Sequence, residues 1–173
     1  LAGLDRDMIA RLGELLERAR LAGHTVFLFG NGGSGSTASH LASDLNKGVS
    51  RGRNPAYRAM CLNDNIPLML AYANDEGYGE VFVGPLQNFL RPGDVVIAIS
   101  GSGNSENVLR AVEYANQNGA FTVGLCGFDG GRLKPLVHLA VHVPVDDMLV
   151  AEDVHFVVGH VLYRLLAHRE GEG

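Results

Sequence analysis

Short runs of consecutive apolar residues alternate along this chain with longer segments in which apolar residues recur every three or four positions. The clearest run, 95–99, is continuously apolar and rich in β-branched residues, as expected for a parallel strand buried on both faces of a sheet. Runs of similar composition predict four more strands. In chain order the predicted strands are 26–29, 57–62, 95–99, 121–126 and 140–143.

The segments between these runs have the periodicity of amphipathic helices. The predicted helices span 4–22, about 37–46, 66–73, 78–90 and about 150–168, with a single helical turn at 132–137. A further helix follows the run 100–106 and stops at 118–119. Gly23 is a plausible stop for the first helix, and Asp146 or Asp147 a plausible cap for the last. Pro85 lies inside 78–90, where a proline is tolerated only at a kink or near the start of a helical segment.

Because strands alternate with helices throughout, the pattern predicts an α/β fold: a three-layer α/β/α sandwich around a mainly parallel five-stranded sheet, doubly wound as in flavodoxin. A chain of 173 residues is expected to form one domain, 1–173. The apolar stripe of the first helix must be buried against this domain or against another subunit. We expect the segment 1–22 to take part in oligomer packing.

The composition of the chain argues against several classes of function. The net charge is −5 and no basic run is present, which argues against a nucleic-acid surface. No apolar run approaches the roughly 18 residues of a membrane span. Cys61 and Cys126 each lie in an apolar run, as expected for buried thiols in a reducing cytoplasm, where we place the protein.

A glycine-rich loop follows the first predicted strand and precedes a helix. Residues 30–35 formally match the GxGxxG pattern of dinucleotide sites, which also requires an acidic residue roughly 20 positions further on. Asp64 comes 29 residues after Gly35, which is too far to support that interpretation. Free backbone N–H groups at a helix start also suit a phosphate on a small molecule.

A second loop, 100–105, follows the strand 95–99 and places Ser100, Ser102 and Ser105 around glycines at the entry of another helix. The carboxyl ends of parallel strands share one edge of the sheet, so the two loops can converge on one crevice. A phosphoryl group would use both loops, whereas a dinucleotide has no evident need of the second. The alternative is that both loops are only tight turns between strand and helix.

These motifs identify a resemblance. Residues 30–34, 99–105 and 74–75 resemble the sugar isomerase (SIS) domain, and more closely its phosphoheptose isomerase branch. The likeness extends over nearly the whole chain, including 128–131 and the last helix. It implies a homotetramer with active sites at subunit contacts, a phosphorylated sugar held by the serine loop, and aldose–ketose isomerisation without a nucleotide cofactor. The expected substrate is sedoheptulose 7-phosphate or a similar ketose phosphate.

Two pairs of residues could supply the acid and the base that such a reaction needs. His40 and Asp44 are four residues apart on one helix face, where a solvated contact is the alternative. His160 shares a face of the last helix with Asp153 but lies among apolar residues, where core histidines are common. The resemblance places His160 at the family's catalytic histidine and Asp44 at its catalytic glutamate. The other histidines, including His155, are expected at the surface or in packing positions.

The resemblance also assigns binding roles. The expected catalytic pair is Asp44 and His160; the expected substrate-binding residues are Asn31, Gly32, Gly33, Ser34, Asp75, Ser100, Gly101, Ser102, Ser105 and Glu152. Some members of the branch bind zinc at four positions, which here are His40, Asp44, Glu152 and His160. Two imidazoles and two carboxylates form a reasonable zinc set.

Two of these positions depart from the family pattern. Asp44 is one methylene shorter than the glutamate it replaces, and Glu152 stands where the family has a glutamine. A base misplaced by about 1 Å can cost about a hundredfold in rate. A non-catalytic SIS protein that senses a phosphosugar or binds a protein partner is therefore the rival to the isomerase.

Overall fold

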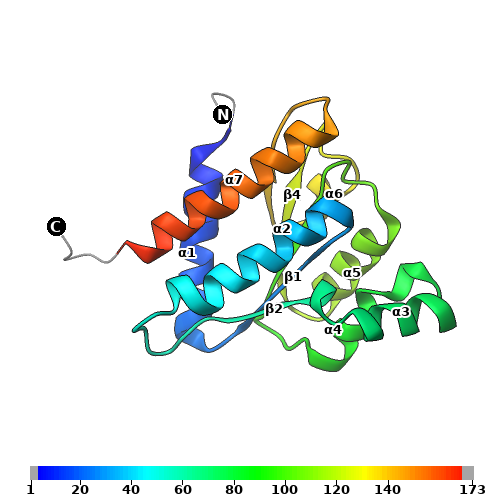
Figure 1. The fold of residues 1–173 in the computed structure, drawn as a ribbon, viewed down its shortest axis with the longest axis horizontal. Coiled ribbons are helices and arrows are strands. Elements are labelled where there is room, and N and C mark those ends of the chain that lie inside the picture. The colour runs from blue at the N-terminus through cyan, green and yellow to red at the C-terminus, as the bar shows by residue number, and fades with distance from the viewer. Residues whose placement is uncertain (1–3, 169–173) are drawn as a thin grey trace.

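The computed structural model describes residues 4–168 and places one five-stranded sheet between two layers of helices (Figure 1). The strand order is β2-β1-β3-β4-β5, and all four pairings are parallel. The strands are β1 (Thr25–Gly30), β2 (Arg58–Cys61), β3 (Val95–Ser100), β4 (Phe121–Cys126) and β5 (Leu139–His142). The predicted α/β sandwich with a parallel sheet is confirmed.

Seven α-helices lie within the described residues. They are α1 (Arg6–Ala22), α2 (Gly32–Ser43), α3 (Ile66–Asp75), α4 (Val83–Phe89), α5 (Glu106–Gln117), α6 (Leu133–Leu136) and α7 (Met148–Ala167). A π-helical segment, Asp44–Val49, continues α2, and 3₁₀ turns occur at Leu62–Asp64 and Tyr78–Glu80. Among residues 4–168, no helix combines the length and the hydropathy that crossing a bilayer requires.

Each face of the sheet carries its own hydrophobic core, because successive side chains of a strand point to opposite faces. Val26 and Leu28 of β1 belong to the core beneath α1, α2 and α7. Phe27 and Phe29 belong to the other core, beneath α4, α5 and α6. The strands are therefore buried on both sides, which explains why they are continuous apolar runs in the sequence.

The apolar stripe of α1 is buried within the chain. Leu12 and Leu16 are fully buried in the core beneath α1, α2 and α7. The helix ends at Gly23, which adopts the left-handed conformation expected of a C-cap glycine. Further contact of segment 1–22 with another subunit stays a prediction, and residues 1–3 of that segment lie outside the described residues.

The largest departure from the sequence prediction is at the start of α2. The helix begins at Gly32 rather than near Thr37, so the glycine-rich segment forms the first turn of the helix. Glycines and serines have weak helix propensity, so local sequence alone favours a loop there. Burial of Ser34 and Thr37 against the body of the protein gives this turn the tertiary support that its sequence lacks.

The predicted helix 78–90 is wrong as a single element. A 3₁₀ turn, Tyr78–Glu80, is followed by α4, which begins only at Val83. Phe82, between the two, is fully buried and stacks on Phe29 with ring centroids 4.7 Å apart. The break places Pro85 in the first turn of α4, where its missing N–H costs no helical hydrogen bond.

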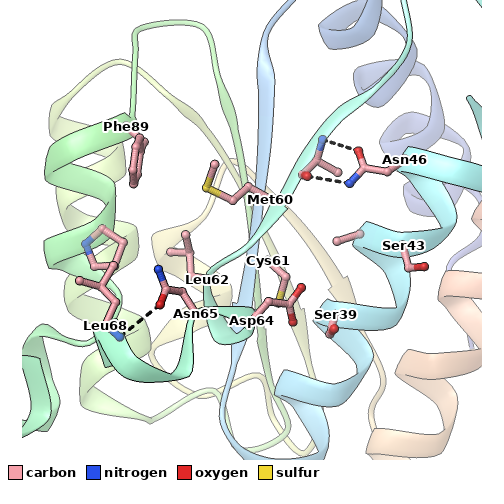
Figure 2. A pocket seen from close by; sticks show the side chains of 13 residues that line it. Ser39, Ser43, Asn46, Met60, Cys61, Leu62, Asp64, Asn65, Leu68 and Phe89 are labelled. Carbon is pink, nitrogen blue, oxygen red and sulfur yellow. Dashed lines mark hydrogen bonds between the residues drawn. The ribbon is translucent and has the colours of Figure 1, made fainter. Parts of the chain in front are cut away.

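Asn46, in the π-helical segment, protects the edge strand β2. Its side-chain amide donates to the carbonyl of Ala59 at 2.8 Å and accepts from the Ala59 N–H at 2.9 Å (Figure 2). The side chain thus acts as a short neighbouring strand and satisfies backbone groups that an edge strand leaves open. The pair borders a hollow of about 700 Å³ between α2 and the α3–α4 region.

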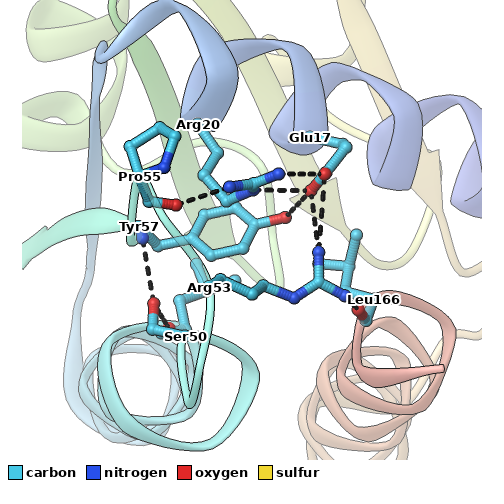
Figure 3. A network of polar contacts seen from close by, with 8 residues as sticks. Glu17, Arg20, Ser50, Arg53, Pro55, Tyr57 and Leu166 are labelled. Carbon is cyan, nitrogen blue, oxygen red and sulfur yellow. Dashed lines mark hydrogen bonds and ion pairs between the residues drawn. The ribbon is translucent and has the colours of Figure 1, made fainter. Parts of the chain in front are cut away.

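A polar network ties α1 to the connection before β2 and to the end of α7 (Figure 3). Its side chains are Glu17, Arg20, Arg53 and Tyr57. The Glu17 carboxylate accepts from Arg20 Nε at 3.0 Å and from the Tyr57 hydroxyl at 2.7 Å. Arg53 lies 3.4 Å from the same carboxylate and donates to the carbonyl of Leu166. The network therefore joins three elements that are distant in sequence.

We predict that Glu17→Gln lowers the free energy of unfolding by about 1–2 kcal/mol at pH 7, because Arg20 is buried and loses its charged partner. Hydrogen bonding by Arg20 lowers the pKa of Glu17 from 4.5 to about 2. A depressed carboxyl pKa stabilises the fold fully above pH 4.5, and this contribution is lost as the pH falls toward 2. Urea denaturation at pH 7, 4.5 and 3 measures both effects.

The control is Glu14→Gln, which makes the same change at an exposed position of α1. The stability difference between wild type and Glu17→Gln should shrink between pH 4.5 and pH 3, while Glu14→Gln follows wild type. A difference that stays constant over this pH range contradicts the role of ionised Glu17.

Candidate active site

The candidate site lies where α2 and α5 begin. Each helix starts directly after a central strand, α2 after β1 and α5 after β3, and these strands are neighbours in the sheet (Figure 1). From β1 the chain continues outward to β2, and from β3 it continues to β4 and β5 on the other side. This is the topological switch point of the sheet, where α/β proteins bind ligands at the carboxyl ends of their strands.

The first loop approaches β3 so closely that residue 30 must lack a side chain. A Cβ at Gly30 would lie 2.6 Å from the carbonyl oxygen of Ile99 and 2.8 Å from Cβ of Ser34. Asn63, after β2, holds this glycine by donating to its carbonyl at 2.8 Å and accepting from its N–H at 3.2 Å. Gly32 and Gly33 are exposed, so their backbone is open to solvent, whereas Ser34 is buried.

The second loop is shaped by its own serines. The N–H of Gly103 donates to the hydroxyl of Ser100 at 3.2 Å, and the N–H of Asn104 donates to the hydroxyl of Ser102 at 3.2 Å. Ser100 and Gly101 are buried, while Ser102 and Ser105 are partly exposed. Ser105 is the N-cap of α5 but its side chain makes no capping hydrogen bond. Hydroxyls and helix-terminal amides thus gather at one place, as in an anion site.

Three side chains meet between α7 and the helix that begins at the glycine-rich turn, about two helical turns beyond Gly32. His40 Nε2 lies 3.1 Å from His160 Nε2 and 3.4 Å from Asp44 Oδ2. The candidate ligand atoms of the three residues all lie within 4.8 Å of one another. His40 and His160 are exposed and Asp44 is partly buried, so the cluster is open to solvent in the single chain. Phe156 packs against both imidazoles, with ring centroids 4.7 and 4.6 Å away.

The cluster exists because α2 and α7 pack side by side and run in the same direction (Figure 1). Glu152 lies against Gly33 near the start of both helices, and Tyr163 lies against Gly48 near their far ends. His40 and His160 meet between these two contacts. His40 and Asp44 share a helix face because they are four residues apart. The packing of α7 brings His160, which is 120 residues away from His40 in the sequence, into contact with that face.

Glu152 lies beside the glycine-rich turn but outside the histidine cluster. Its carboxylate lies against Gly33, close enough that a Cβ at position 33 would overlap it. Within the described residues, the metal-ligand group contains His40, Asp44 and His160 and does not include Glu152. The structure therefore brings three of the four predicted zinc ligands together and places the fourth against the glycine-rich turn.

The fully buried histidine of α7 is His155 rather than His160. Neither ring nitrogen of His155 has a hydrogen-bond partner among the described residues, and burial lowers the pKa of this imidazole. The backbone at Cys126 raises the pKa of His155, but the effect of burial is larger. The alternative of a core histidine thus applies to His155, and His160 lies on the exposed face with Val157 and Val161.

Asp75 lies at the end of α3 and accepts a hydrogen bond from Asn74 at 2.7 Å. Three residues later, the hydroxyl of Tyr78 reaches the side chain of Asn31 at 2.9 Å, which brings this segment to the first loop. Asn107, in the first turn of α5, also pairs with Asn31. Sequence reasoning missed Asn107 and Tyr78. For Asn107 the available signal was its position two residues after Ser105, at the start of the predicted helix.

Comparison with known proteins places the chain in a family. The family model described as "SIS domain" matches residues 3–127. A phosphoheptose isomerase from Chlorobaculum tepidum is 38% identical over 169 residues, covering 96% of this chain and 81% of that protein. A phosphoheptose isomerase from Nitratiruptor sp. is 39% identical over 141 residues, covering 82% of this chain and 75% of that protein.

Solved structures agree with these relatives. A phosphoheptose isomerase from Francisella tularensis superposes with a TM-score of 0.89 at 27% identity, covering 96% of this chain and 88% of that one. The enzyme of the same name from Neisseria gonorrhoeae gives a TM-score of 0.85 at 26% identity, covering 92% and 85%. Sequence and architecture lead to one conclusion: the chain belongs to the phosphoheptose isomerase family of SIS-domain proteins.

Proposed function

We propose that the protein is a phosphosugar aldose–ketose isomerase that converts sedoheptulose 7-phosphate to the aldose heptose 7-phosphate. The observation that carries this proposal is the meeting of His40, Asp44 and His160, because α2, which carries His40, begins at the glycine-rich turn. Relatives at 38% and 39% identity are named phosphoheptose isomerases. The proposal thus combines a cluster of side chains able to transfer protons with a loop of hydroxyls and amides able to bind a phosphate.

The phosphate would bind at the serine loop. Ser102 and Ser105 are accessible there, and the first turn of α5 offers backbone N–H groups and the positive end of its dipole. Ser100 and Ser34 are buried and would contribute mainly by shaping the two loops. These neutral donors fit a protein of net charge −5, because one phosphate needs no basic patch when amides and hydroxyls surround it.

The isomerisation moves one proton from C1 to C2 of the sugar and another from the oxygen on C1 to the oxygen on C2. In our proposal the Asp44 carboxylate takes the proton from C1 as a base and returns it to C2. His160 takes the proton from the C1 hydroxyl and gives one to the oxygen on C2. His40 lies within 3.4 Å of both side chains and holds them in position.

Three further residues are proposed to contact the hydroxyls of the sugar. Asn31 and Glu152 lie at the first turn of α2, and Asp75 lies in the segment that Tyr78 connects to Asn31. Their oxygens and amide groups offer both donors and acceptors. A seven-carbon sugar phosphate would thus be held at its phosphate end by α5 and along its chain by α2, α3 and α7.

The histidine cluster also fits a zinc ion in donor type and in spacing. Imidazole nitrogen and carboxylate oxygen are ligands that Zn²⁺ accepts, and the atoms lie within 4.8 Å of one another. His40, Asp44 and His160 would hold the ion, and Glu152 would have to turn from Gly33 to become the fourth ligand. When bound, zinc supplies Lewis-acid polarisation of the sugar carbonyl. Asp44 and His160 act as base and acid in the metal-free protein.

We propose that the protein forms the homotetramer that its family resemblance implies, with α7 at a subunit contact. Beside His160, the helix exposes an apolar stripe that includes Val157, Val161 and Leu165, the last being 48% exposed. An apolar surface of this kind next to a polar site marks an interface. A second subunit would cover the stripe and close the open side of the histidine cluster.

The two cysteines support a reducing location, and we propose the cytoplasm. Cys61 and Cys126 are both buried and unpaired. Burial raises the pKa of Cys61 to about 12 and that of Cys126 to about 11, so both stay protonated at neutral pH. Protonated, buried thiols are the ordinary state of cysteines in a reducing compartment.

The second candidate is a non-catalytic SIS protein that binds a phosphosugar. Asp44 favours it, because the family resemblance places a glutamate there and the shorter side chain changes the reach of the base. Both candidates bind a phosphosugar, but only the isomerase converts it to product. Measuring binding and turnover together therefore separates them.

We predict that the purified protein converts sedoheptulose 7-phosphate to an aldose, and that His160→Ala lowers kcat at least about a hundredfold. Binding of inorganic phosphate should stay within twofold, because the serine loop is untouched. The control is His24→Ala, at the opposite edge of the sheet, which should retain wild-type kcat. Phosphosugar binding without turnover of any ketose phosphate would falsify the isomerase and support the binding protein.

Zinc binding is predicted for the metal-free wild type, measured by calorimetry with ZnCl₂ alone. His40→Ala should weaken it about tenfold or more, because the central imidazole of the cluster is lost. His138→Ala, whose imidazole contacts Thr122 outside the cluster, serves as the matched control. Equal zinc affinity in wild type and His40→Ala contradicts a metal site at this cluster.

Val161→Glu is predicted to dissociate the tetramer, because a carboxylate cannot be buried in an apolar contact without a partner. Light scattering after gel filtration should give four times the chain mass of 18.5 kDa for wild type and a smaller assembly for the variant. The control Gln87→Glu adds the same charge at an exposed polar position of α4. An unchanged mass for Val161→Glu rules out this face of α7 as the contact.

A further inference from the structure

We propose that Asn107 and Tyr78 are positioning residues that hold the amide of Asn31 in one orientation, so that it offers the substrate a single N–H donor. This inference rests on the proposed function, since it assigns a partner to one sugar oxygen. It predicts that the oxygen facing Asn31 is recognised as an acceptor, as a carbonyl oxygen or a developing oxyanion would be.

The amides of Asn31 and Asn107 form a reciprocal pair. Asn31 Nδ2 donates to Asn107 Oδ1 at 2.9 Å, and Asn107 Nδ2 donates to Asn31 Oδ1 at 2.9 Å. The hydroxyl of Tyr78 donates to the same Asn31 Oδ1 at 2.9 Å. Because a carbonyl oxygen has two lone pairs, Asn31 Oδ1 is fully occupied. One hydrogen on Nδ2 of Asn31 remains without an acceptor among the described residues.

A reciprocal amide pair could in principle be reversed by turning both side chains over. The backbone of α5 prevents this. The N–H of Val108 is shared between Asn107 Oδ1 and the carbonyl of Ser105, each at 3.0 Å, so turning Asn107 would place an NH₂ group against this backbone N–H. With Asn107 fixed, Asn31 must direct its oxygen toward Asn107 Nδ2 and its nitrogen toward Asn107 Oδ1. The orientation is therefore determined by the start of α5.

Burial makes this arrangement costly to break. Asn107 is only 3% exposed, and its Oδ1 and Nδ2 have no alternative partner among the described residues. Asn31 is the N-cap of α2 but makes no capping hydrogen bond, because its amide is already committed to Asn107 and Tyr78. A residue type that normally caps its own helix is used here to connect the two loops.

The position of the free donor suits the sugar rather than the phosphate. Asn31 is partly exposed and lies beside Gly32 and Gly33 at the mouth of the first loop, whereas the accessible serines belong to the second loop. Tyr78 is 56% exposed and comes from the segment that carries Asp75. Residues from three segments of the chain thus fix the direction of the free N–H bond of Asn31. Such fixed donors are the preorganisation that an active site requires.

The test compares the binding of sedoheptulose 7-phosphate with that of inorganic phosphate by calorimetry at pH 8. Asn107→Asp keeps the size of the side chain and the bond from Val108 but replaces the donor to Asn31 by an oxygen. We expect it to weaken binding of the sugar phosphate about tenfold and that of phosphate less than twofold. Tyr78→Phe, which removes only one hydrogen bond, should weaken sugar-phosphate binding about two- to fivefold.

Asn118→Asp makes the same change at the exposed end of α5 and should match wild type in both measurements. An Asn107→Asp variant that binds the sugar phosphate within twofold of wild type, or that loses both ligands equally, overturns the proposal. If Asn107→Asp does not fold, the same comparison is made with Tyr78→Phe. The proposal is then overturned if Tyr78→Phe does not weaken binding of the sugar phosphate more than binding of inorganic phosphate.

Amide exchange tests the arrangement without any ligand. In ¹⁵N-labelled wild type, one of the two side-chain amide protons of Asn31 should exchange slowly and the other rapidly, and Tyr78→Phe should speed up the slow one. Equal exchange of the two protons in wild type overturns the inference. If wild type shows one slow and one rapid amide proton on Asn31 but does not turn over the sugar phosphate, the proposed function has failed. The positioning of Asn31 then still stands.

Discussion

The close approach of β1 and β3 at the carboxyl edge of the sheet is the constraint on which the rest of the site depends. Gly30 passes the carbonyl of Ile99 without room for a Cβ, so α2 and α5 begin side by side. Two helix N-termini with their unpaired amides then face the same crevice. Asn63 holds Gly30 through two hydrogen bonds, which adds support from the edge of the sheet.

The histidine cluster depends on a second packing relation, that between α2 and α7. The two helices run in the same direction and touch through small residues, with Leu41 near Gly159 and Tyr163 over Gly48. The close contact brings His160 within 3.1 Å of His40. The polar network around Glu17 fastens the far end of α7 to α1 and to the connection before β2, and so stabilises this packing from outside the site.

Polar groups without formal charge dominate the crevice. The glycine-rich turn, the serine loop and the Asn31–Asn107 pair supply amides and hydroxyls, and the charged members of the candidate site are carboxylates. In the proposed function an anionic ligand is held by many oriented dipoles rather than by one cation, which costs little rearrangement when it binds. This is consistent with the negative net charge of the chain and with the absence of a basic run in its sequence.

Much of this could be predicted from the sequence alone. The run 95–99 predicted a buried parallel strand, and the glycine-rich and serine-rich loops predicted the carboxyl edge of the sheet as the candidate site, because these are local patterns with local causes. The first turn of α2 and the break before α4 could not be predicted. Both depend on burial of Ser34 and Phe82 by residues far away in the chain.

The same division runs through the site. The sequence by itself determined that His40 and Asp44 share a helix face and that a glycine-rich loop and a serine-rich loop each follow a strand. Only the tertiary structure decided that His160 is exposed while His155 is buried, that Glu152 lies against Gly33, and that Asn107 orients Asn31. The physical reason is that spacing along a helix sets the direction of a side chain, whereas the partner it meets depends on which elements the sheet brings together.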